Sequence, residues 1–367
     1  MTPSAADPGF HLILRIDEPE LSESTRDVLQ ALRPGGVHFG REAFLHDEPY
    51  PVWLEAFSRL REAISEATGR ERLIWALDHE GGRVHRVPPP IAHFPYSLNW
   101  RERAHEVGEA IGVALRSLGF NVVFGPCLDV FANPQNEVIG PRAFGVDADE
   151  VIRFALPYIR AVQAQGVAAV GKHYPGHGRT LLDSHFALPT LDDPLDALRS
   201  TDVRPFQAAM AEADLGAIMS AHILFPAIDS EWPASLSEAF CGAFLRETLA
   251  YEGVVIADDF DMKAVADRYS LEVLAARTLA APADMVIFNH HYDRALCWRD
   301  AIDRLVTQDA AAAARLAAGR TRVTRWLDRL QHGQPTLLPP DTLQQQQALV
   351  AAIPQAHTID VEEFTGE

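Results

Sequence analysis

The stretch 171–189 gathers ionisable side chains between glycines and prolines. It follows the apolar run 167–170, which is typical of a buried strand. The ionisable side chains that it carries are Lys172, His173, His177, Asp183 and His185. A buried strand that ends in a segment rich in Gly, Pro and ionisable groups is typical of an active-site loop. The sequence therefore predicts that this loop supplies a proton donor.

Asp183 and His185 form the candidate pair for that proton transfer. A carboxylate two residues from an imidazole orients the ring and favours its protonated form, so His185 is usable as a general acid near neutral pH. A lone Asp-x-His pattern more often marks a solvated loop in which Asp183 is only a turn residue. The pair needs support from the rest of the chain.

A metal site is the alternative for the same stretch. Imidazole and carboxylate ligands are available from His173, His177, Asp183 and His185. Barrel metal hydrolases usually begin with a His-x-His pair after the first strand, and here that position is Leu-Arg-Ile. Glycines on both sides of His177 indicate tight backbone turns rather than a rigid chelate. The metal hypothesis is the weaker one, and no cofactor is expected.

Asp258 and Asp259 are the second chemical candidate. They directly follow the apolar run 253–257, so at least one carboxylate should stand at the end of a buried strand. The functional interpretation is a nucleophile or a metal ligand. The alternative is a helix N-cap for the segment that begins near Met262, because Asp satisfies free backbone amides there.

Short apolar runs alternate with amphipathic segments along the chain and should position these residues. The expected strands are 11–16, 36–40, 72–77, 121–125, 167–170, 216–220, 253–257 and 284–288. The expected helices are 22–32, 52–68, 101–118, 148–165, 194–213, 237–251 and 271–281, with more helix to about 331. This alternation predicts an α/β fold, a single (β/α)8 TIM-type barrel over residues 1–335. Residues 336–367 are expected to form a C-terminal tail, a helical extension. A doubly wound sheet is the alternative, but no Gly-x-Gly-x-x-Gly follows the first strand.

Functional side chains of such barrels lie at the carboxyl ends of the strands. The ionisable or amide residues at those ends are Asp78, Arg83, Asp129, Lys172 to His185, His222, Asp258, Asp259, Asn289 and His290. They should therefore converge on one mouth. Arg86 and Arg142, beside glycine-rich segments, are candidates for binding an oxygen-rich substrate, the alternative being surface ion pairs.

Composition excludes several other classes of protein. The net charge of −19 over 367 residues, with no basic stripe, argues against a nucleic-acid partner. No segment approaches the length of a membrane span, and residues 1–8 lack a signal-like pattern, so a cytoplasmic location is expected. The three cysteines are far apart and odd in number, which disfavours a disulfide framework.

The motifs together resemble glycoside hydrolase family 3, specifically its single-domain bacterial β-N-acetylglucosaminidases. The most specific part is Lys-His-Tyr-Pro-Gly-His-Gly at 172–178, followed after four residues by Asp-Ser-His at 183–185. Relatives in the family that act on glucosides generally lack the second part. The resemblance continues through blocks at 78–86, 124–129, 138–142, 219–222, 233–237, 257–262 and 283–285.

Carried over by position, the resemblance implies retaining hydrolysis without metal through a covalent glycosyl-enzyme on Asp258. His185 would be the acid/base and Asp183 its partner. The residues implied to hold N-acetylglucosamine are Asp78, Arg86, Arg142, Lys172 and His173. His79 and Tyr174 depart from the usual Gln and Phe, and 39–42 lacks the usual Arg-Asn, which bears on substrate preference.

The expected protein is thus a β-N-acetylhexosaminidase that releases terminal N-acetylglucosamine from muropeptide or chito-type fragments. Its expected partner is a small saccharide, and the sequence leaves the oligomeric state open. Three alternatives remain: a phosphorylase of the same fold, a non-catalytic sugar-binding barrel and a metal-dependent barrel hydrolase.

Overall fold

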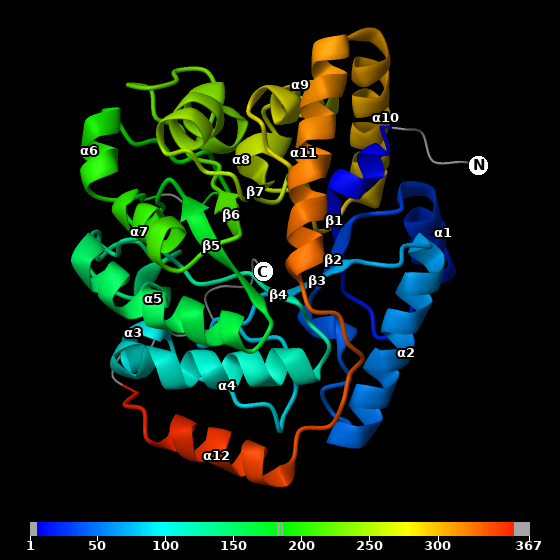
Figure 1. Cartoon of the computed structure of the whole chain (residues 1–367), viewed down its shortest axis with the longest axis vertical. Helices are drawn as coiled ribbons and strands as arrows, with labels where there is room; N and C mark the ends of the chain where they lie inside the picture. The colour runs from blue at the N-terminus through cyan, green and yellow to red at the C-terminus, as the bar shows by residue number, and fades with distance from the viewer. Residues whose placement is uncertain (1–5, 182–183, 185, 356–367) are drawn as a thin grey trace.

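The chain folds as a closed barrel of parallel strands wrapped by helices (Figure 1). The computed structural model describes residues 6–181, 184 and 186–355. Within these residues the strands are β1 (Leu12–Ile16), β2 (Gly36–Phe39), β3 (Ile74–Leu77), β4 (Val122–Val123), β5 (Ala168–Tyr174), β6 (Ala217–Ser220), β7 (Val254–Ala257) and β8 (Met285–Phe288). Their order around the barrel follows the chain, and β8 closes onto β1 by parallel pairing. The predicted (β/α)8 barrel is confirmed.

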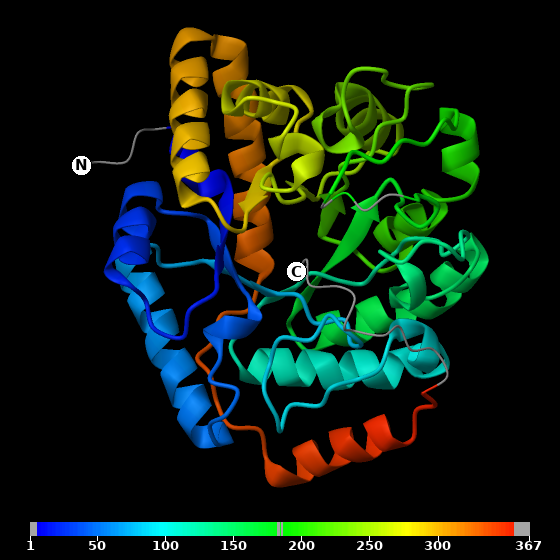
Figure 2. The same ribbon diagram turned by 180° about the vertical axis from the view of Figure 1, so that it is seen from behind.

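The helices of the described residues form the outer layer (Figure 2). They are α1 (Glu23–Leu32), α2 (Tyr50–Thr68), α3 (Ser97–Trp100), α4 (Ala104–Ser117), α5 (Ala148–Ala164), α6 (Leu195–Ser200), α7 (Arg204–Glu212), α8 (Lys263–Ala266), α9 (Leu271–Ala280), α10 (Tyr292–Gln308), α11 (Ala310–Arg329) and α12 (Pro340–Ala351). A π-helical segment, Glu238–Thr248, stands between β6 and β7. Short 3₁₀ turns are Pro8–His11, Arg41–Ala43, Arg101–Arg103, Gly140–Arg142 and Ala234–Leu236.

Alternation along each strand separates two apolar clusters. On β1, Leu12 and Leu14 belong to the cluster shared with the surrounding helices, whereas Ile13 belongs to the barrel interior. Trp326 of α11 joins the interior cluster, so α11 closes the amino-terminal end of the barrel. A Cβ at Gly216 would lie 2.8 Å from the Trp326 indole nitrogen, so only glycine fits beneath this helix. The opposite, carboxyl-terminal end of the barrel carries the side chains that directly follow the strands.

The helical extension expected after the barrel is present as α12. It lies along α4 in both views (Figures 1 and 2), where Gln346 donates a 3.0 Å hydrogen bond to the carbonyl of Ala110. Leu338 and Ile353, at its two ends, are buried. The extension therefore packs onto the outside of the barrel.

All eight predicted strands are found, with ends within two residues of expectation except the carboxyl end of β5. β5 runs on to Tyr174, so Lys172 and His173 lie on a strand rather than in a loop. The prediction of a single helix over 194–213 is wrong, because the helix is interrupted between α6 and α7. There the buried carboxylate of Asp202 turns inward to pair with Arg179, and Pro205 favours a new helix start.

Among the described residues, no helix combines the length and the apolar character needed to cross a membrane.

Candidate active site

A pocket opens at the carboxyl ends of the strands, the end opposite α11. Counted with the open space at its mouth, it encloses about 870 Å³. The residues predicted from the sequence that line it are Asp78, Arg86, Arg142, Lys172, His173 and Asp258. The fold therefore brings together residues that are up to 180 positions apart in the chain (78 to 258).

Strand alternation explains why these side chains point into the barrel. Ile74 and Ala76 of β3 belong to the interior cluster, and the next position with the same parity is Asp78. In the same way, Ile256 of β7 is followed by Asp258. The period of two continues beyond the last strand residue, so the apolar interior gives way to a polar layer at the mouth.

Lys172 is held between two carboxylates on the floor of the pocket. Its Nζ donates to Asp78 Oδ1 at 2.6 Å and lies 2.7 Å from Glu80 Oε1. Burial alone would raise the pKa of Asp78, but the ammonium of Lys172, with His38 and Arg86, outweighs it and lowers this pKa to about 2. Asp78 is therefore ionised throughout the physiological range.

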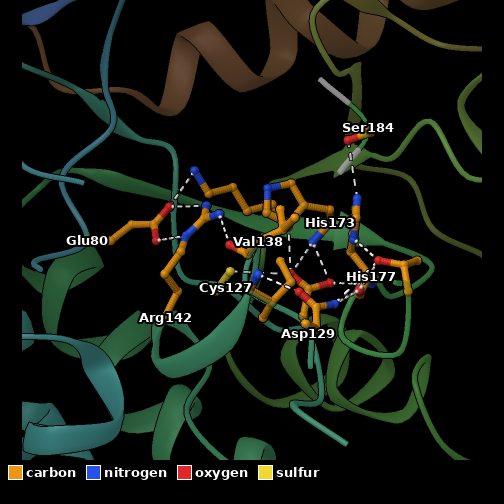
Figure 3. Close-up of polar contacts among 12 residues, drawn as sticks. Glu80, Cys127, Asp129, Val138, Arg142, His173, His177 and Ser184 are labelled. Atoms are coloured by element: carbon orange, nitrogen blue, oxygen red, sulfur yellow. Dashed lines mark hydrogen bonds and ion pairs between the residues drawn. The ribbon is translucent and has the colours of Figure 1, made fainter. Parts of the chain in front are cut away.

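Arg142 forms a two-pronged contact with the same glutamate. Its Nε and Nη2 each donate to a different carboxylate oxygen of Glu80 at 2.9 Å, and its Nη1 donates to the carbonyl of Val138 (Figure 3). Burial opposes ionisation of Glu80, but Arg142 and Lys172 prevail and hold its pKa well below the usual range. Glu80 thus fixes two of the predicted sugar-binding cations.

Asp129 organises the turn after β5. It accepts the backbone N–H groups of His173 and His177, and the ring Nδ1 of His173 donates to its Oδ2 at 2.7 Å (Figure 3). Burial would raise the pKa of Asp129, but His173 and His177 lower it to about 2. With Nδ1 as the donor, the other nitrogen of His173 is left as a hydrogen-bond acceptor.

Asp258 and Asp259 differ in environment although they are adjacent. Asp258 lines the pocket, and the backbone N–H of Asp259 donates to its Oδ1 at 2.9 Å. The side chain of Asp259 is buried and accepts backbone N–H groups of Asp261 and Asn289. Burial, then the nearby carboxylates of Asp261 and Asp258, raise the pKa of Asp259 to about 8. The side chain of Asp259 is therefore a neutral carboxyl below that pH.

The predicted acid/base pair, Asp183 and His185, lies outside the described residues. Ser184 between them is described: it lines the same pocket, and its hydroxyl is 3.2 Å from the Nε2 of His177. Its carbonyl accepts the N–H of Ala264 in α8 at 3.3 Å. Ser184 is thus tethered both to the turn after β5 and to the helix after Asp258.

Three ionisable residues of the site, two of which line the pocket, were absent from the predicted set of site residues. Arg15 on β1 and His38 on β2 point inward because they share the parity of Ile13 and Gly36, a signal that strand alternation already carries. His38 Nε2 donates to Asn289 Oδ1 at 2.6 Å. Burial is the main cause that lowers the pKa of His38 to about 4, so this imidazole is neutral at physiological pH. Glu80, the third, acts through Lys172 and Arg142.

Of the described residues, one group of three has ligand atoms close enough to hold a metal ion: Cys127, Asp129 and His173. The carboxylate is already occupied by hydrogen bonds from the turn after β5. Burial raises the pKa of Cys127 well above its usual value, and its thiol donates to Asp129 at 3.3 Å. The group acts as a hydrogen-bonded support rather than an open chelate.

Comparison with known proteins identifies the family. Residues 13–326 match the model of the glycosyl hydrolase family 3 N-terminal domain. The chain belongs to glycosyl hydrolase family 3. This confirms the family and the hydrolase class expected from the motifs at 172–178 and 183–185.

Individual relatives share most of the chain. The β-hexosaminidase of Thioalkalivibrio sulfidiphilus is 34% identical over 319 residues, covering 83% of this chain and 87% of that protein. The structure of a family 3 β-N-acetylglucosaminidase from Paenibacillus sp. superposes with a TM-score of 0.82 at 30% identity, covering 94% of this chain and 67% of that one. NagZ from Neisseria gonorrhoeae, solved with N-trifluoroacetyl-D-glucosamine, gives a TM-score of 0.69 at 26% identity and covers 93% and 97%.

Proposed function

We propose that this protein is a retaining, exo-acting β-N-acetylhexosaminidase that releases terminal non-reducing N-acetylglucosamine. The similar proteins named β-hexosaminidase and β-N-acetylglucosaminidase support the substrate class. The pocket supports exo action because the apolar interior cluster closes it from below. A pocket with one opening accepts the end of a glycan rather than its middle.

The observation that carries the proposal is the position of Asp258. It stands on the pocket wall at the end of β7, diametrically opposite Asp78 at the end of β3, since the two strands are four apart in a barrel of eight. The N–H of Asp259 orients its carboxylate. We assign Asp258 as the nucleophile that attacks the anomeric carbon of the bound sugar.

We assign His185 as the acid/base and Asp183 as the residue that orients it. The link between Ser184, the Ala264 amide and the His177 ring supports this assignment, because it joins the centre of the Asp-Ser-His motif to the helix that follows the nucleophile. Most retaining enzymes use a second carboxylic acid here. An imidazole needs no large pKa shift to be protonated near neutral pH.

The reaction then proceeds in two displacements. In the first, Asp258 bonds to the anomeric carbon while His185 gives its proton to the glycosidic oxygen, and the leaving group departs. In the second, His185 takes a proton from a water molecule whose oxygen attacks the same carbon. The bond to Asp258 breaks, and the sugar leaves with its original configuration.

Asp78, Arg86, Arg142, Lys172 and His173 are the proposed sugar-holding residues. Lys172 donates to Asp78 Oδ1 and pairs with Glu80, so the second carboxylate oxygen of Asp78 can accept a hydrogen bond from a sugar hydroxyl. Charge-assisted hydrogen bonds of this kind are stronger than neutral ones. We further propose muropeptide fragments in the bacterial cytoplasm as the natural substrates.

The test is release of nitrophenol from 4-nitrophenyl N-acetyl-β-D-glucosaminide. Asp258→Asn removes the nucleophile without changing its shape, and we expect kcat to fall by about 10³-fold or more. Asp267→Asn, an exposed carboxylate nine residues further on, is the matched control and should leave kcat unchanged. Turnover of Asp258→Asn close to wild type would remove the assignment.

Product analysis separates hydrolysis from phosphorolysis. In phosphate buffer we expect free N-acetylglucosamine, and N-acetylglucosamine 1-phosphate would contradict a hydrolase.

A further inference from the structure

Arg15 is a pocket cation of intermediate burial that uses few of its hydrogen-bond donors. It lines the pocket from β1, and its side chain is 11% exposed. Within the described part of the chain, its guanidinium makes one ion pair, 3.1 Å from Asp17 Oδ2, and its Nε is buried without a hydrogen-bond partner. Lys172, by contrast, is held by both Asp78 and Glu80.

An arginine with an unused buried donor destabilises the fold unless a ligand supplies the missing hydrogen-bond acceptor. Each buried donor without a partner has lost its hydrogen bonds to water, and this loss destabilises the fold. Asp17 is 37% exposed, and a pair with a carboxylate so close to water is weak and easily exchanged. Asp78 does not neutralise Arg15, because it is bound to Lys172 and the neutral His38 lies on the strand between them. The guanidinium is therefore available to a ligand.

The position of Arg15 decides which part of a substrate it meets. Arg15 pairs with His38 in the ladder between β1 and β2, and its side chain lines the pocket from the β1 wall beside Asp17. In an exo-acting enzyme the released sugar occupies this pocket, so this sugar meets the β1 wall. This step rests on the proposed function, with the anomeric carbon at Asp258.

The ring orientation follows from the strand order. C1 and C4 are opposite corners of a pyranose, so C1 at β7 puts C4 near Asp78 at β3. The edge with the C2 acetamido and C3 hydroxyl groups suits Lys172 and His173 on β5, which offer several polar atoms. The other edge, with C5 and C6, then faces the β8–β1–β2 wall that carries Arg15.

We propose that Arg15 forms a subsite for an anionic substituent on C6 of the bound sugar, a sulfate, phosphate or carboxylate. A planar guanidinium matches the paired oxygens of such groups. The net charge of −19 disfavours anions in general, so a pocket cation with unused donors gives an anionic substituent a specific binding position.

The test compares 4-nitrophenyl N-acetyl-β-D-glucosaminide with its 6-O-sulfate, on wild type and Arg15→Gln. The quantity is the ratio of kcat/KM for the sulfated over the unsulfated substrate. We expect Arg15→Gln to lower this ratio about tenfold or more, and Arg15→Lys to restore part of it. Arg199→Gln, at an exposed arginine of α6 that does not line the pocket, is the matched control and should leave the ratio unchanged.

A second readout does not depend on turnover. Calorimetric binding of N-acetylglucosamine 6-sulfate and N-acetylglucosamine to the wild type should favour the sulfated sugar, and Arg15→Gln should abolish the preference. Equal loss on both ligands would show a structural role for Arg15 and overturn the proposal. So would Arg15-dependent preference for a 3-O-sulfate. Failure to cleave even the unsulfated glycoside would instead refute the proposed function.

Discussion

At the scale of single residues, the pocket is built from charges that are fixed before substrate arrives. Lys172 binds Asp78 and Glu80, and Glu80 also binds Arg142. Taking such charges out of water is costly, and the cost is offset only where each has a partner. Removal of Glu80 would take this carboxylate from Arg142 and would leave Lys172 with Asp78 alone. The arrangement therefore favours fixed orientation over stability.

Asp259 gives a prediction at the same scale. Its pKa of about 8 means that the carboxyl is protonated at neutral pH, and an amide is a close neutral copy of it. Asp259→Asn should keep kcat at pH 6 within about threefold of wild type, whereas Asp258→Asn abolishes activity. A loss as large as that of Asp258→Asn would mean that the ionised form of Asp259 is required.

Stability provides an independent check on Asp259. Its folded-state pKa is raised above the usual 3.8, so its contribution is fully present below that pH and is lost as pH rises toward 8. In Asp259→Asn no carboxyl titrates at this position, so this loss of stability with rising pH should be absent. The free energy of unfolding, measured by urea at pH 5 and pH 8, should fall less with pH in Asp259→Asn than in wild type or in the exposed control Asp267→Asn.

A site residue could be predicted from the sequence only where the pattern that reveals it lies nearby in the chain. Asp78 and Asp258 directly follow apolar strands, so local pattern was enough. Arg15 and His38 needed the alternation within a strand to be followed to its end. Glu80 could not be found in this way, because its partner Arg142 is 62 residues away and only the fold brings the two together.

At the scale of elements, the segment between β3 and α3 carries three histidine rings in contact. The ring centroids of His79 and His85 are 4.6 Å apart, and those of His85 and His93 are 4.1 Å apart. Burial is the main cause that lowers the pKa of His79 to about 3, with added repulsion from His93 and Arg86. His79 is therefore neutral at physiological pH, and its neutral ring packs within the segment that carries Asp78 and Arg86.

This gives a pH prediction for the segment. His79 has a folded-state pKa below the usual 6.5, so stability is lost as pH falls below 6.5. Between pH 6.5 and 5 one such histidine costs about 2 kcal/mol. In His79→Gln the free energy of unfolding should fall by about that much less over this interval. His105→Gln, an exposed histidine of α4, should behave as wild type, and so would His79→Gln if its ring were already charged when folded.

Elements were predictable where one physical cause dominated. Buried parallel strands show as apolar runs, and all eight were found. The extension of β5 through Lys172 and His173 was missed because ionisable residues rarely continue a strand into the interior. The break between α6 and α7 depends on the buried pair of Asp202 and Arg179, which no local pattern indicates.

At the scale of the whole molecule, the two ends of the barrel have separate tasks. α11 fills the amino-terminal end with apolar side chains, and the carboxyl end carries the polar layer. α12 lies on the outside, against α4. We therefore propose that residues 1–335 carry the activity and that 336–367 contribute stability.

Truncation after Pro335 tests this division. It removes Leu338 and Ile353, which are buried against the barrel, and each such side chain contributes about 1.5–3 kcal/mol. The free energy of unfolding should fall by roughly 3 kcal/mol, with kcat and KM for the aryl glycoside unchanged, because α12 does not line the pocket. If the truncated chain does not fold, Leu338→Ala with Ile353→Ala in the full chain gives the same comparison. A change in KM without loss of stability would contradict the division, since it would tie the extension to the pocket.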